Sequence, residues 1–438
     1  MRGVERIFSL SPYESYAYSY PHKTAYRMLA RPRPLGDVWA GERKDALFLY
    51  LHVPFCEMRC GFCNLFTTTD PKADFENVYL DALLRQSQVV GDALGEARFA
   101  RVALGGGTPT FLSLSALDTL FDGVERIFGP ARGVPTSCET SPLTATEEKL
   151  RLLRGRGVDR VSIGVQSFIE QEVNAVGRAQ KTSVVERALT RIRKVGFPVL
   201  NIDLMYGLPH QTVESWLGSL EEALHYEPEE LYLYPLYVRP LTGMGRRPKA
   251  WDDVRLDCYR AGRDTLLGAG YEQVSMRMFR SAQAPSRAEP VYCCQEDGMV
   301  GLGCGARSYT RGLHYSNEYA VGASGVREII ERYAASSDAQ FGEACYGFEL
   351  DEDEERRRFL IKSLLRTEGL CLDAYRERFG ADVSADFPEL DALSQDGLAT
   401  SDGRQLRLSE RGLELSDAIG PWLYSAAVRR LGESYELR

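Results

Sequence analysis

Short runs of apolar and β-branched residues alternate along this chain with longer segments in which apolar residues recur every three or four positions. The longer segments, such as 75–94 and 182–195, have the period of helices with one buried face. The short runs cover residues 46–53, 99–106, 134–140, 158–165, 197–205 and 230–237. Strand signals separated by helix signals predict βαβ units, a parallel sheet and therefore an α/β fold.

Glycine-rich and polar segments follow the carboxyl ends of these predicted strands. A cysteine-rich stretch at 56–63 follows the first strand, and "GGGTPT" at 105–110 follows the second. Glu139, Gln166 and Asp203 lie at or near the ends of the third, fourth and fifth strands. Because ligand sites in parallel α/β sheets gather at the carboxyl ends of strands, we expect one rim of the sheet to hold the functional site.

The two ends of the chain have a different character. The first forty-odd residues are rich in Tyr and Pro without a clear period, which predicts an extended arm packed on the main domain. Its five tyrosines and His22 either form a lid over an aromatic or nucleotide-like substrate or cover an apolar groove. Beyond Asp351 the pattern of helix, helix, hairpin and helix predicts a winged-helix-like domain. We therefore expect four units: an arm (1–44), a core (45–240), a barrel extension with the substrate-pocket region (241–345) and a C-terminal domain (346–438).

Composition narrows the classes of function. The chain has 438 residues and is 44% hydrophobic, which is enough for a large core. A net charge of -9 does not provide the basic surface that phosphate backbones need, so we expect no nucleic-acid partner. No apolar run approaches the roughly 20 residues that cross a bilayer, and the first residues lack the apolar region of a signal peptide. These observations predict a cytoplasmic protein without a membrane partner.

Three of the ten cysteines, Cys56, Cys60 and Cys63, lie within eight residues. A structural zinc site generally has four ligands, often from two CxxC-type pairs, and the sequence has no second pair. An iron–sulfur cube can be held by thiolates of one short loop, and three thiolates leave one iron for an external ligand. The adjacent Cys293 and Cys294 fit best as apolar filling, with a metal or redox role as the alternative.

The chain resembles the radical S-adenosylmethionine (SAM) superfamily, and within it the branch of the oxygen-independent coproporphyrinogen III oxidases, the heme chaperones and the class C methyltransferases. The resemblance covers roughly residues 45 to 320 and rests on "LYLHVPFCEMRCGFC", "LGGGTPT", "SCETSP", "RVSIGVQSF", "VGRAQ", "NIDLMYGLPHQT" and "VGLGCGA". It implies a partial (β/α)6 barrel, a [4Fe–4S] cluster on the three clustered cysteines and SAM on the open iron. In this family the reduced cluster cleaves SAM to a 5′-deoxyadenosyl radical that abstracts hydrogen from a substrate.

The resemblance also assigns residues to the cofactor. It places Tyr50 near SAM, with Tyr50 and Glu139 as the candidate catalytic residues, and Phe62 beside the adenine. Backbone groups of three residues would approach methionine or ribose atoms: Gly106, Gly107 and Thr108. The side chains that would bind polar groups of the cofactor are Glu139, Gln166, Arg178 and Asp203. Ala306 lies in the glycine loop that would contact a second SAM molecule.

Each assignment has a structural alternative. The aromatic residues are also suited to a core, the glycines to a tight turn, and the polar residues to caps, loop hydrogen bonds or a surface ion pair. For His52 we expect a hydrogen bond to the backbone that orders the cysteine loop, rather than acid–base chemistry. Arg277, Arg280 and Arg311 suit an anionic substrate group if they are not simply solvated.

Two departures from the family pattern bear on the reaction. The oxidases carry a further cysteine where this chain has Leu65, and the His-Asn-Phe-Tyr signature of the heme chaperones is missing. The sequence therefore favours class C-type methyl transfer or cyclopropanation of a small molecule. Oxidase-like decarboxylation and heme-chaperone-like delivery stay as alternatives.

Tyr237 stands where the oxidases carry a small residue, which leaves the number of SAM molecules at one or two. We also expect a flavodoxin or ferredoxin-type electron donor and a monomer.

Overall fold

A single mixed sheet dominates the computed structural model, which describes residues 7, 11–17, 19–69, 74–129, 133–245, 253–285 and 293–436. Its strands follow the order β1-β13-β12-β11-β10-β2-β3-β4-β5-β6-β7-β9-β8. The central six run parallel in chain order: β2 (Leu47–Val53), β3 (Phe99–Gly106), β4 (Thr136–Thr140), β5 (Arg160–Gln166), β6 (Val199–Tyr206) and β7 (Glu230–Pro235). The predicted α/β fold with a partial barrel is confirmed.

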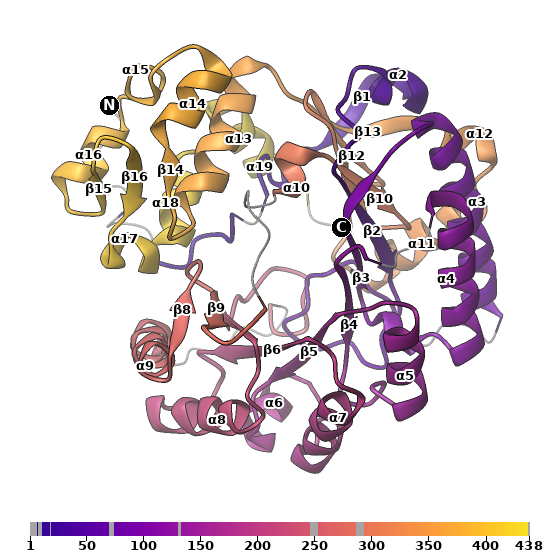
Figure 1. Cartoon of the computed structure of the whole chain (residues 1–438), viewed down its shortest axis with the longest axis horizontal. Helices are drawn as coiled ribbons and strands as arrows, with labels where there is room; N and C mark the ends of the chain where they lie inside the picture. Colours follow the sequence, from indigo (N-terminus) through magenta and orange to yellow (C-terminus); the bar gives the residue numbers. More distant parts are fainter. Residues whose placement is uncertain are drawn as a thin grey trace.

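Helices cover the outer side of these strands (Figure 1). They are α3 (Phe75–Leu94), α4 (Leu114–Phe128), α5 (Glu147–Gly155), α6 (Glu170–Ala175), α7 (Thr182–Val195) and α8 (Val213–His225), with a short 3-10 helix η2 (Pro109–Phe111) before α4. The strand predicted at 99–106 and the helices predicted at 75–94 and 182–195 have the predicted bounds. These segments bury one face against the sheet, so the spacing of their apolar residues was sufficient to predict their bounds.

Shorter strands extend the sheet at both sides. Next to β2 lie β10 (Met299–Leu302), which is parallel to it, and then β11 (Arg307–Tyr309), β12 (Leu313–Ser316) and β13 (Glu343–Glu349), which are joined by antiparallel pairs. Next to β7 lie β9 (Met278–Ser281) and β8 (Tyr271–Gln273). Four further helices accompany this part of the chain: α9 (Arg255–Gly268), α10 (Cys294–Asp297), α11 (Ala323–Ala334) and α12 (Asp338–Phe341).

The prediction of a wholly extended arm was wrong for its second half. Residues 23–40 form a 3-10 helix η1 (Lys23–Ala25), strand β1 (Arg27–Pro34) and helix α2 (Leu35–Ala40). β1 is an edge strand that pairs antiparallel with β13, so that Arg27 lies opposite Gly347. Its sequence "RMLARPRP" has no apolar alternation, and two prolines are tolerated because the strand is at an edge. The partner strand is too distant in sequence for a local pattern to reveal the pairing.

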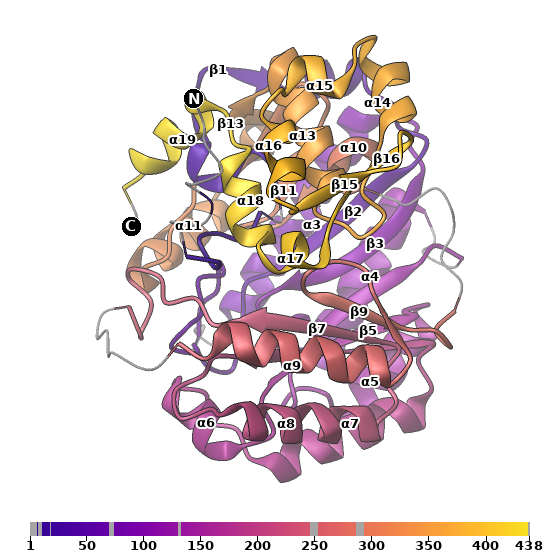
Figure 2. The same ribbon diagram turned by 90° about the vertical axis from the view of Figure 1, so that its left-hand side faces the viewer.

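The elements of the C-terminal part lie together on one side of the sheet (Figure 2). Their buried core is distinct from that of the barrel and includes arm residues such as Tyr20. These elements are α13 (Glu352–Leu364), β14 (Leu370–Cys371), α14 (Leu372–Phe379), α15 (Val383–Asp386), α16 (Leu390–Gln395), β15 (Ala399–Ser401), β16 (Gln405–Leu408), α17 (Glu410–Glu414), α18 (Ser416–Trp422) and α19 (Ala426–Glu433). The three short strands make a sheet in the order β14-β16-β15, with β15 and β16 as the hairpin that the sequence predicts.

The first half of the arm runs between the barrel and this C-terminal part. The backbone N–H of Tyr20 donates to Gln295 at 3.1 Å, and the Gln295 amide donates back to the Tyr20 carbonyl at 3.0 Å. The hydroxyl of the fully buried Tyr20 donates to Glu354 of α13. Tyr13 is also buried. Ala17 and Tyr20 belong to the buried apolar cluster of the C-terminal part, so this part of the arm covers an apolar groove. Tyr18 lies outside the described residues.

None of the helices in the described part of the chain has the length and apolarity that crossing a membrane requires.

Candidate active site

The barrel strands direct alternate side chains into an interior space. On β2, Leu49 and Leu51 are 2% and 1% exposed and point toward the helices, whereas Tyr50 between them faces inward and is partly exposed. On β7 the fully buried Leu231 and Leu233 flank Tyr232, which is likewise partly exposed. Since side chains alternate across a strand, the inward residues line a space that solvent enters.

The glycine turn after β3 packs against three other parts of this rim. A Cβ on Gly105 would lie 2.9 Å from the Glu139 carboxyl group, and one on Gly106 would lie 2.6 Å from the His52 ring. Gly106 also has a φ of +112°, which side chains disfavour. A Cβ on Gly107 would lie 2.6 Å from the Phe55 carbonyl oxygen and 3.0 Å from the sulfur of Cys56.

The backbone N–H groups of this turn are occupied within the protein. Gly106 donates to Glu139 at 3.0 Å, Gly107 donates to Val53 at 2.8 Å, and Thr108 donates to Phe55 at 2.8 Å. The backbone groups that suit a cofactor ammonium here are the carbonyl oxygens, each of which has two lone pairs.

The cysteine loop follows β2 and is held by neighbouring loops. The N–H of Cys56 donates to Thr68 at 3.0 Å, and the N–H of Gly61 donates to Val176, beyond α6, at 2.7 Å. A Cβ on Gly61 would come within 2.8 Å of that same carbonyl oxygen. Glycine at position 61 therefore allows the loop between Cys60 and Cys63 to lie directly on the α6–α7 connection.

The three clustered cysteines form no disulfide, and they are close enough for their charges to interact. Burial raises the pKa of Cys56 to about 12, with smaller contributions from Cys63 and Cys60. Burial and then Cys60 raise the pKa of Cys63. Bound iron would remove these protons, because a metal cation stabilises the thiolate.

The donor set fits an iron–sulfur cube. Among the described residues no three His, Cys, Asp or Glu side chains converge closely enough to hold one metal ion. A cube does not need such convergence, because each thiolate binds a different iron. Three cysteines on one loop, whose charges influence one another beside a partly exposed interior, suit that arrangement.

His52 orders the cysteine loop through the expected backbone hydrogen bond. Its Nε2 lies 3.0 Å from the carbonyl oxygen of Phe66, and its Nδ1 lies 3.3 Å from the hydroxyl of Tyr50. Burial lowers the His52 pKa to about 4, so the ring is neutral at pH 7. A carbonyl only accepts, so Nε2 carries the hydrogen and Nδ1 accepts from Tyr50.

Glu139 and Asp203 face each other's charge inside the barrel. Burial and then Asp203 raise the pKa of Glu139 to about 7, although Gly106 and Arg160 oppose the shift. Burial raises the pKa of Asp203 to about 6, against hydrogen bonds from Asn201 and Ser162. Glu139 has exposed surface but is enclosed by protein, which explains how an accessible carboxyl group is strongly desolvated.

Arg178 contacts the cysteine loop directly. Its Nη1 donates to the sulfur of Cys60 at 3.3 Å, and its Nη2 donates to the carbonyl of Gly164 at 2.6 Å. Gln180 accepts from its Nε at 2.8 Å. The sequence placed Arg178 at the cofactor but did not predict the contact with Cys60 or the role of Gln180, which stands two residues away in "RAQ".

Gln166 ends β5 in a left-handed conformation, with a φ of 72°. The pairing of β5 with β6 shifts register between Gly164 and Gln166. Non-glycine residues in this conformation store strain and are concentrated at functional sites. The sequence gives no sign of this bulge.

The remaining predicted residues lie around the same rim. Phe62 packs on the buried cluster of Val176, Met205, Leu208 and Leu236, together with the partly buried Tyr234. Ala306 is buried after Gly305, where a Cβ would lie 2.8 Å from Phe66 and 3.0 Å from His52. Gly301 of the preceding strand β10 pairs with Tyr50 of β2. The structure therefore brings the predicted cofactor residues to one end of the barrel.

The arginines expected at an anionic substrate are paired within the protein. Arg277 is buried and pairs with Asp417, and Arg280 pairs with Glu230. The exposed Arg311 pairs with Glu355 at 2.9 Å. The sequence left two alternatives for these arginines, an anionic substrate group or simple solvation. The structure instead pairs each of them with a carboxylate that lies far away in the sequence.

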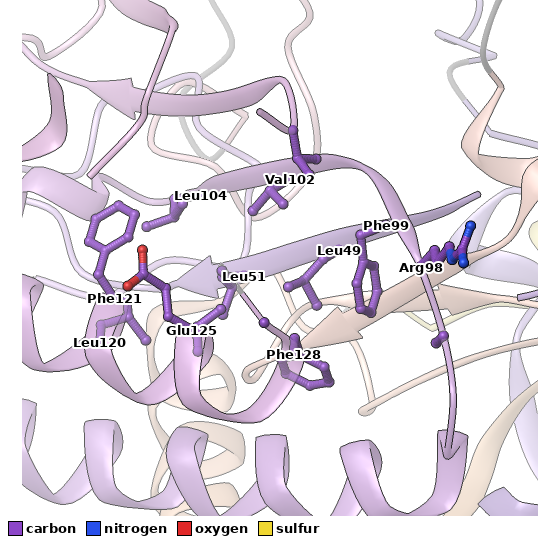
Figure 3. Close-up of a pocket in the computed structure, with 14 residues that line it drawn as sticks. Leu49, Leu51, Arg98, Phe99, Val102, Leu104, Leu120, Phe121, Glu125 and Phe128 are labelled. Atoms are coloured by element: carbon purple, nitrogen blue, oxygen red, sulfur yellow. The ribbon is translucent and has the colours of Figure 1, made fainter. Parts of the chain in front are cut away.

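A cavity of about 320 Å3 lies outside the barrel and apart from this rim (Figure 3). It is lined by the outward Leu49 and Leu51 of β2, by β3 and by α4 residues such as Phe128. Arg98 and Val134, which precede β3 and β4, place it toward the amino ends of the strands. It is therefore separate from the candidate active site.

Comparison with known proteins agrees with this geometry. Residues 50–223 match the radical SAM superfamily, and residues 350–415 match the HemN C-terminal domain. The heme chaperone HemW of Escherichia coli is 33% identical over 59% of this chain and 69% of its own length. The oxygen-independent coproporphyrinogen III oxidase of Synechocystis is 26% identical over 84% of this chain and 83% of its own. In fold, the coproporphyrinogen III oxidase HemN of E. coli matches with a TM-score of 0.80 at 24% identity, over 93% of this chain and 96% of that one.

The chain belongs to the radical SAM superfamily, in the branch that contains the HemN-like oxidases and the HemW heme chaperones. It is a radical SAM enzyme, and the cofactors of its family are a [4Fe–4S] cluster and SAM.

Proposed function

We propose that Cys56, Cys60 and Cys63 hold the cluster and that SAM binds across the adjoining rim of the barrel. The observation that carries this proposal is the meeting of the cysteine loop with the glycine turn, where Gly107 leaves no room for a Cβ beside Cys56. When bound, the reduced cluster supplies the electron that cleaves SAM to a radical able to abstract hydrogen from a small-molecule substrate.

The chain's own residues would position the cofactor. Phe62 and the apolar residues around it would hold the adenine. Arg178 has two N–H groups beyond the three hydrogen bonds described above, and these suit a carboxylate. Glu139 and Asp203 would accept from the ammonium or the ribose hydroxyls, and a cationic neighbour would lower both pKa values. Gln166 and Tyr50 would complete the polar wall.

For the reaction we propose class C-type methyl transfer or cyclopropanation. Tyr232 and Tyr234 stack with their ring centres 5.8 Å apart and 18° between planes, which gives the inner wall a flat aromatic face. Arg277 and Arg280 are neutralised by Asp417 and Glu230. This wall suits a flat aromatic substrate better than a molecule with several carboxylates. An electron donor of the reduced flavodoxin or ferredoxin type completes the proposal.

Formation of 5′-deoxyadenosine tests the cluster assignment. Anaerobically reconstituted and dithionite-reduced protein should release it from SAM, and Cys56→Ala, Cys60→Ala and Cys63→Ala should not. Cys345→Ala is the matched control, because Cys345 is a partly buried residue of β13, which lies four strands away from β2 in the sheet. Equal yields from the three cysteine variants and the control would refute the assignment.

Methyl-deuterated SAM tests the reaction. Deuterium in the product would support methyl transfer, and its absence from every product would contradict it.

A second candidate is oxidative decarboxylation, favoured by the similarity to the Synechocystis oxidase over most of both chains. Release of carbon dioxide from coproporphyrinogen III would support it.

The sequence similarity to the heme chaperone HemW also favours a role in heme delivery. Stoichiometric heme uptake, seen by visible absorbance, without 5′-deoxyadenosine would support delivery over catalysis.

A further inference from the structure

Each of the three clustered cysteine sulfurs has a side-chain hydrogen-bond donor beside it. The hydroxyl of Thr108 donates to Cys56 at 3.6 Å, and Arg178 donates to Cys60 at 3.3 Å. The hydroxyl of Thr67 lies 3.9 Å from the sulfur of Cys63 and becomes the donor when that cysteine is a thiolate. Arg178 is the charged member of this set and makes the shortest of the three contacts.

The guanidinium of Arg178 is fixed where it meets Cys60. The residue is 8% exposed, and its Nε and Nη2 are bound to Gln180 and to the Gly164 carbonyl. Gln180 is itself anchored, because its amide donates to the carbonyls of Val165 at 2.9 Å and Ser167 at 3.2 Å. An arginine keeps its charge in proteins, so a permanent positive charge is held against one sulfur.

We propose that Arg178 raises the reduction potential of the cluster by donating to Cys60, and that Gln180 is the positioning residue that holds it there. This inference rests on the proposed function, in which Cys60 is a cluster ligand. Reduction adds negative charge to the cluster and its thiolates, and hydrogen bonds to the sulfurs stabilise that charge. The effect is large in an enclosed site, where the effective dielectric constant is low.

If Arg178 contacts both Cys60 and the carboxylate of SAM, it would also link SAM binding to the reduction potential of the cluster. A bound carboxylate would neutralise part of the guanidinium charge, so SAM binding and cluster reduction would be coupled through one side chain.

The test is a redox titration of the reconstituted cluster, followed by electron paramagnetic resonance without SAM. At the midpoint potential of the unchanged protein, Arg178→Gln should lower the ratio of reduced to oxidised cluster about tenfold, a shift of about 59 mV for one electron. Arg178→Lys should lower it less, because it keeps the charge. Arg187→Gln is the matched control, since it removes the same charge from an exposed position of α7. A potential in Arg178→Gln equal to that of the control would overturn the inference.

Gln180→Met keeps the inference testable if Arg178→Gln takes up no cluster. This variant keeps the arginine but removes the acceptor of its Nε. Its reduction potential should therefore be lower than that of the unchanged protein but higher than that of Arg178→Gln. If Arg178→Gln holds no cluster, Arg178→Lys serves as the lower reference. An unchanged potential in both Gln180→Met and Arg178→Lys would also overturn the inference. Iron content distinguishes a failure of the ligand assignment from a failure of the role of Arg178. Cluster uptake by the Cys60→Ala variant equal to that of Cys345→Ala would refute the ligand assignment, whereas normal ligand behaviour with an unshifted potential would refute only the role of Arg178.

Discussion

At the scale of single residues, the candidate site depends on where side chains are excluded as much as on where they lie. The turn contains three glycines at which a Cβ would collide with a different neighbour each time. These neighbours are Glu139 for Gly105, His52 for Gly106 and the loop of Cys56 for Gly107. One turn thereby brings a carboxylate, an imidazole and a thiol to the same rim. A substitution at any one of these glycines should disturb the functional group that it faces.

Gly106→Ala should reduce stability by about 1–3 kcal/mol, because it combines a strained φ with contact at the His52 ring. Urea unfolding of the reconstituted and apo proteins measures the change, and iron content should fall as well. Gly270→Ala is the control, since Gly270 has a φ of +83° with nothing within 4 Å of the added Cβ. A loss in Gly270→Ala as large as that in Gly106→Ala would show that the contact with His52 is unimportant.

Glu139 should make the stability of the apo protein depend on pH. In the unfolded chain a glutamate titrates near about 4.3, whereas the folded carboxyl titrates at about 7 beside Asp203 and Arg160. Between these pH values the folded state binds the proton more tightly, so this contribution to stability is present at low pH and is lost as the pH rises toward 7. Glu139→Gln should therefore gain stability relative to the unchanged protein between pH 5 and pH 8 in thermal unfolding. A difference that stays constant over this range would contradict the assignment.

At the scale of elements, strand β5 ends in a feature that only the three-dimensional pairing defines. The register shift against β6 places Gln166 in the left-handed region, where L-residues with a Cβ are disfavoured by roughly 1–2 kcal/mol. The bulge begins at Gly164, and the carbonyl of Gly164 accepts a hydrogen bond from Arg178. Strain at β5 therefore coincides with the support of the cysteine loop.

The variants Gln166→Gly and Gln166→Ala test this bulge as a pair, because both remove the side-chain amide. The glycine variant should be more stable by about 1 kcal/mol in urea unfolding, since glycine adopts a positive φ without a steric penalty. In a regular strand the order would be reversed. Both variants should lose SAM affinity to the same degree if the amide is the cofactor contact, which isothermal titration under anaerobic conditions measures.

The sequence predicted elements whose signals are local and missed those defined by distant partners. The six parallel strands are buried on one or both faces and read as apolar runs, as at 99–106. The flanking strands β8, β9, β11 and β12 pair within local hairpins but are only three or four residues long, which is too short for a clear period. β10 and β13 pair with the distant strands β2 and β1. Spacing alone indicated the cysteines, whereas the hydrogen bonds from Thr108 and Arg178 to their sulfurs form only when separate loops meet.

At the scale of the whole molecule, a buried ionic group joins the arm, the barrel and the C-terminal part. Arg277, before β9, pairs with Asp417 of α18, and the two are 4% and 1% exposed. The hydroxyl of Tyr237 donates to Asp417 and accepts from Arg277 at 2.8 Å. The ring of Tyr16 from the arm lies 3.7 Å from the guanidinium. Four chain segments thus depend on one pair of charges.

Asp417→Ala should cost about 3–5 kcal/mol in urea unfolding, because it leaves the Arg277 charge buried without its carboxylate. The C-terminal part should also become more sensitive to limited proteolysis. Asp373→Ala is the comparison, since it breaks an exposed pair with Arg376 and should cost less than about 1 kcal/mol. Similar losses in the two variants would show that burial does not govern the strength of the Arg277 pair.

The position of the arm has a consequence for biosynthesis. The hydroxyl of Tyr20 accepts from the backbone of Ser425, 405 residues further along the chain. At a translation rate of about 5–20 residues per second, roughly 20–80 s pass on the ribosome before this contact can form. During that interval the tyrosine-rich segment around Tyr20 has no groove to enter, so we expect it to be open to early chaperone binding.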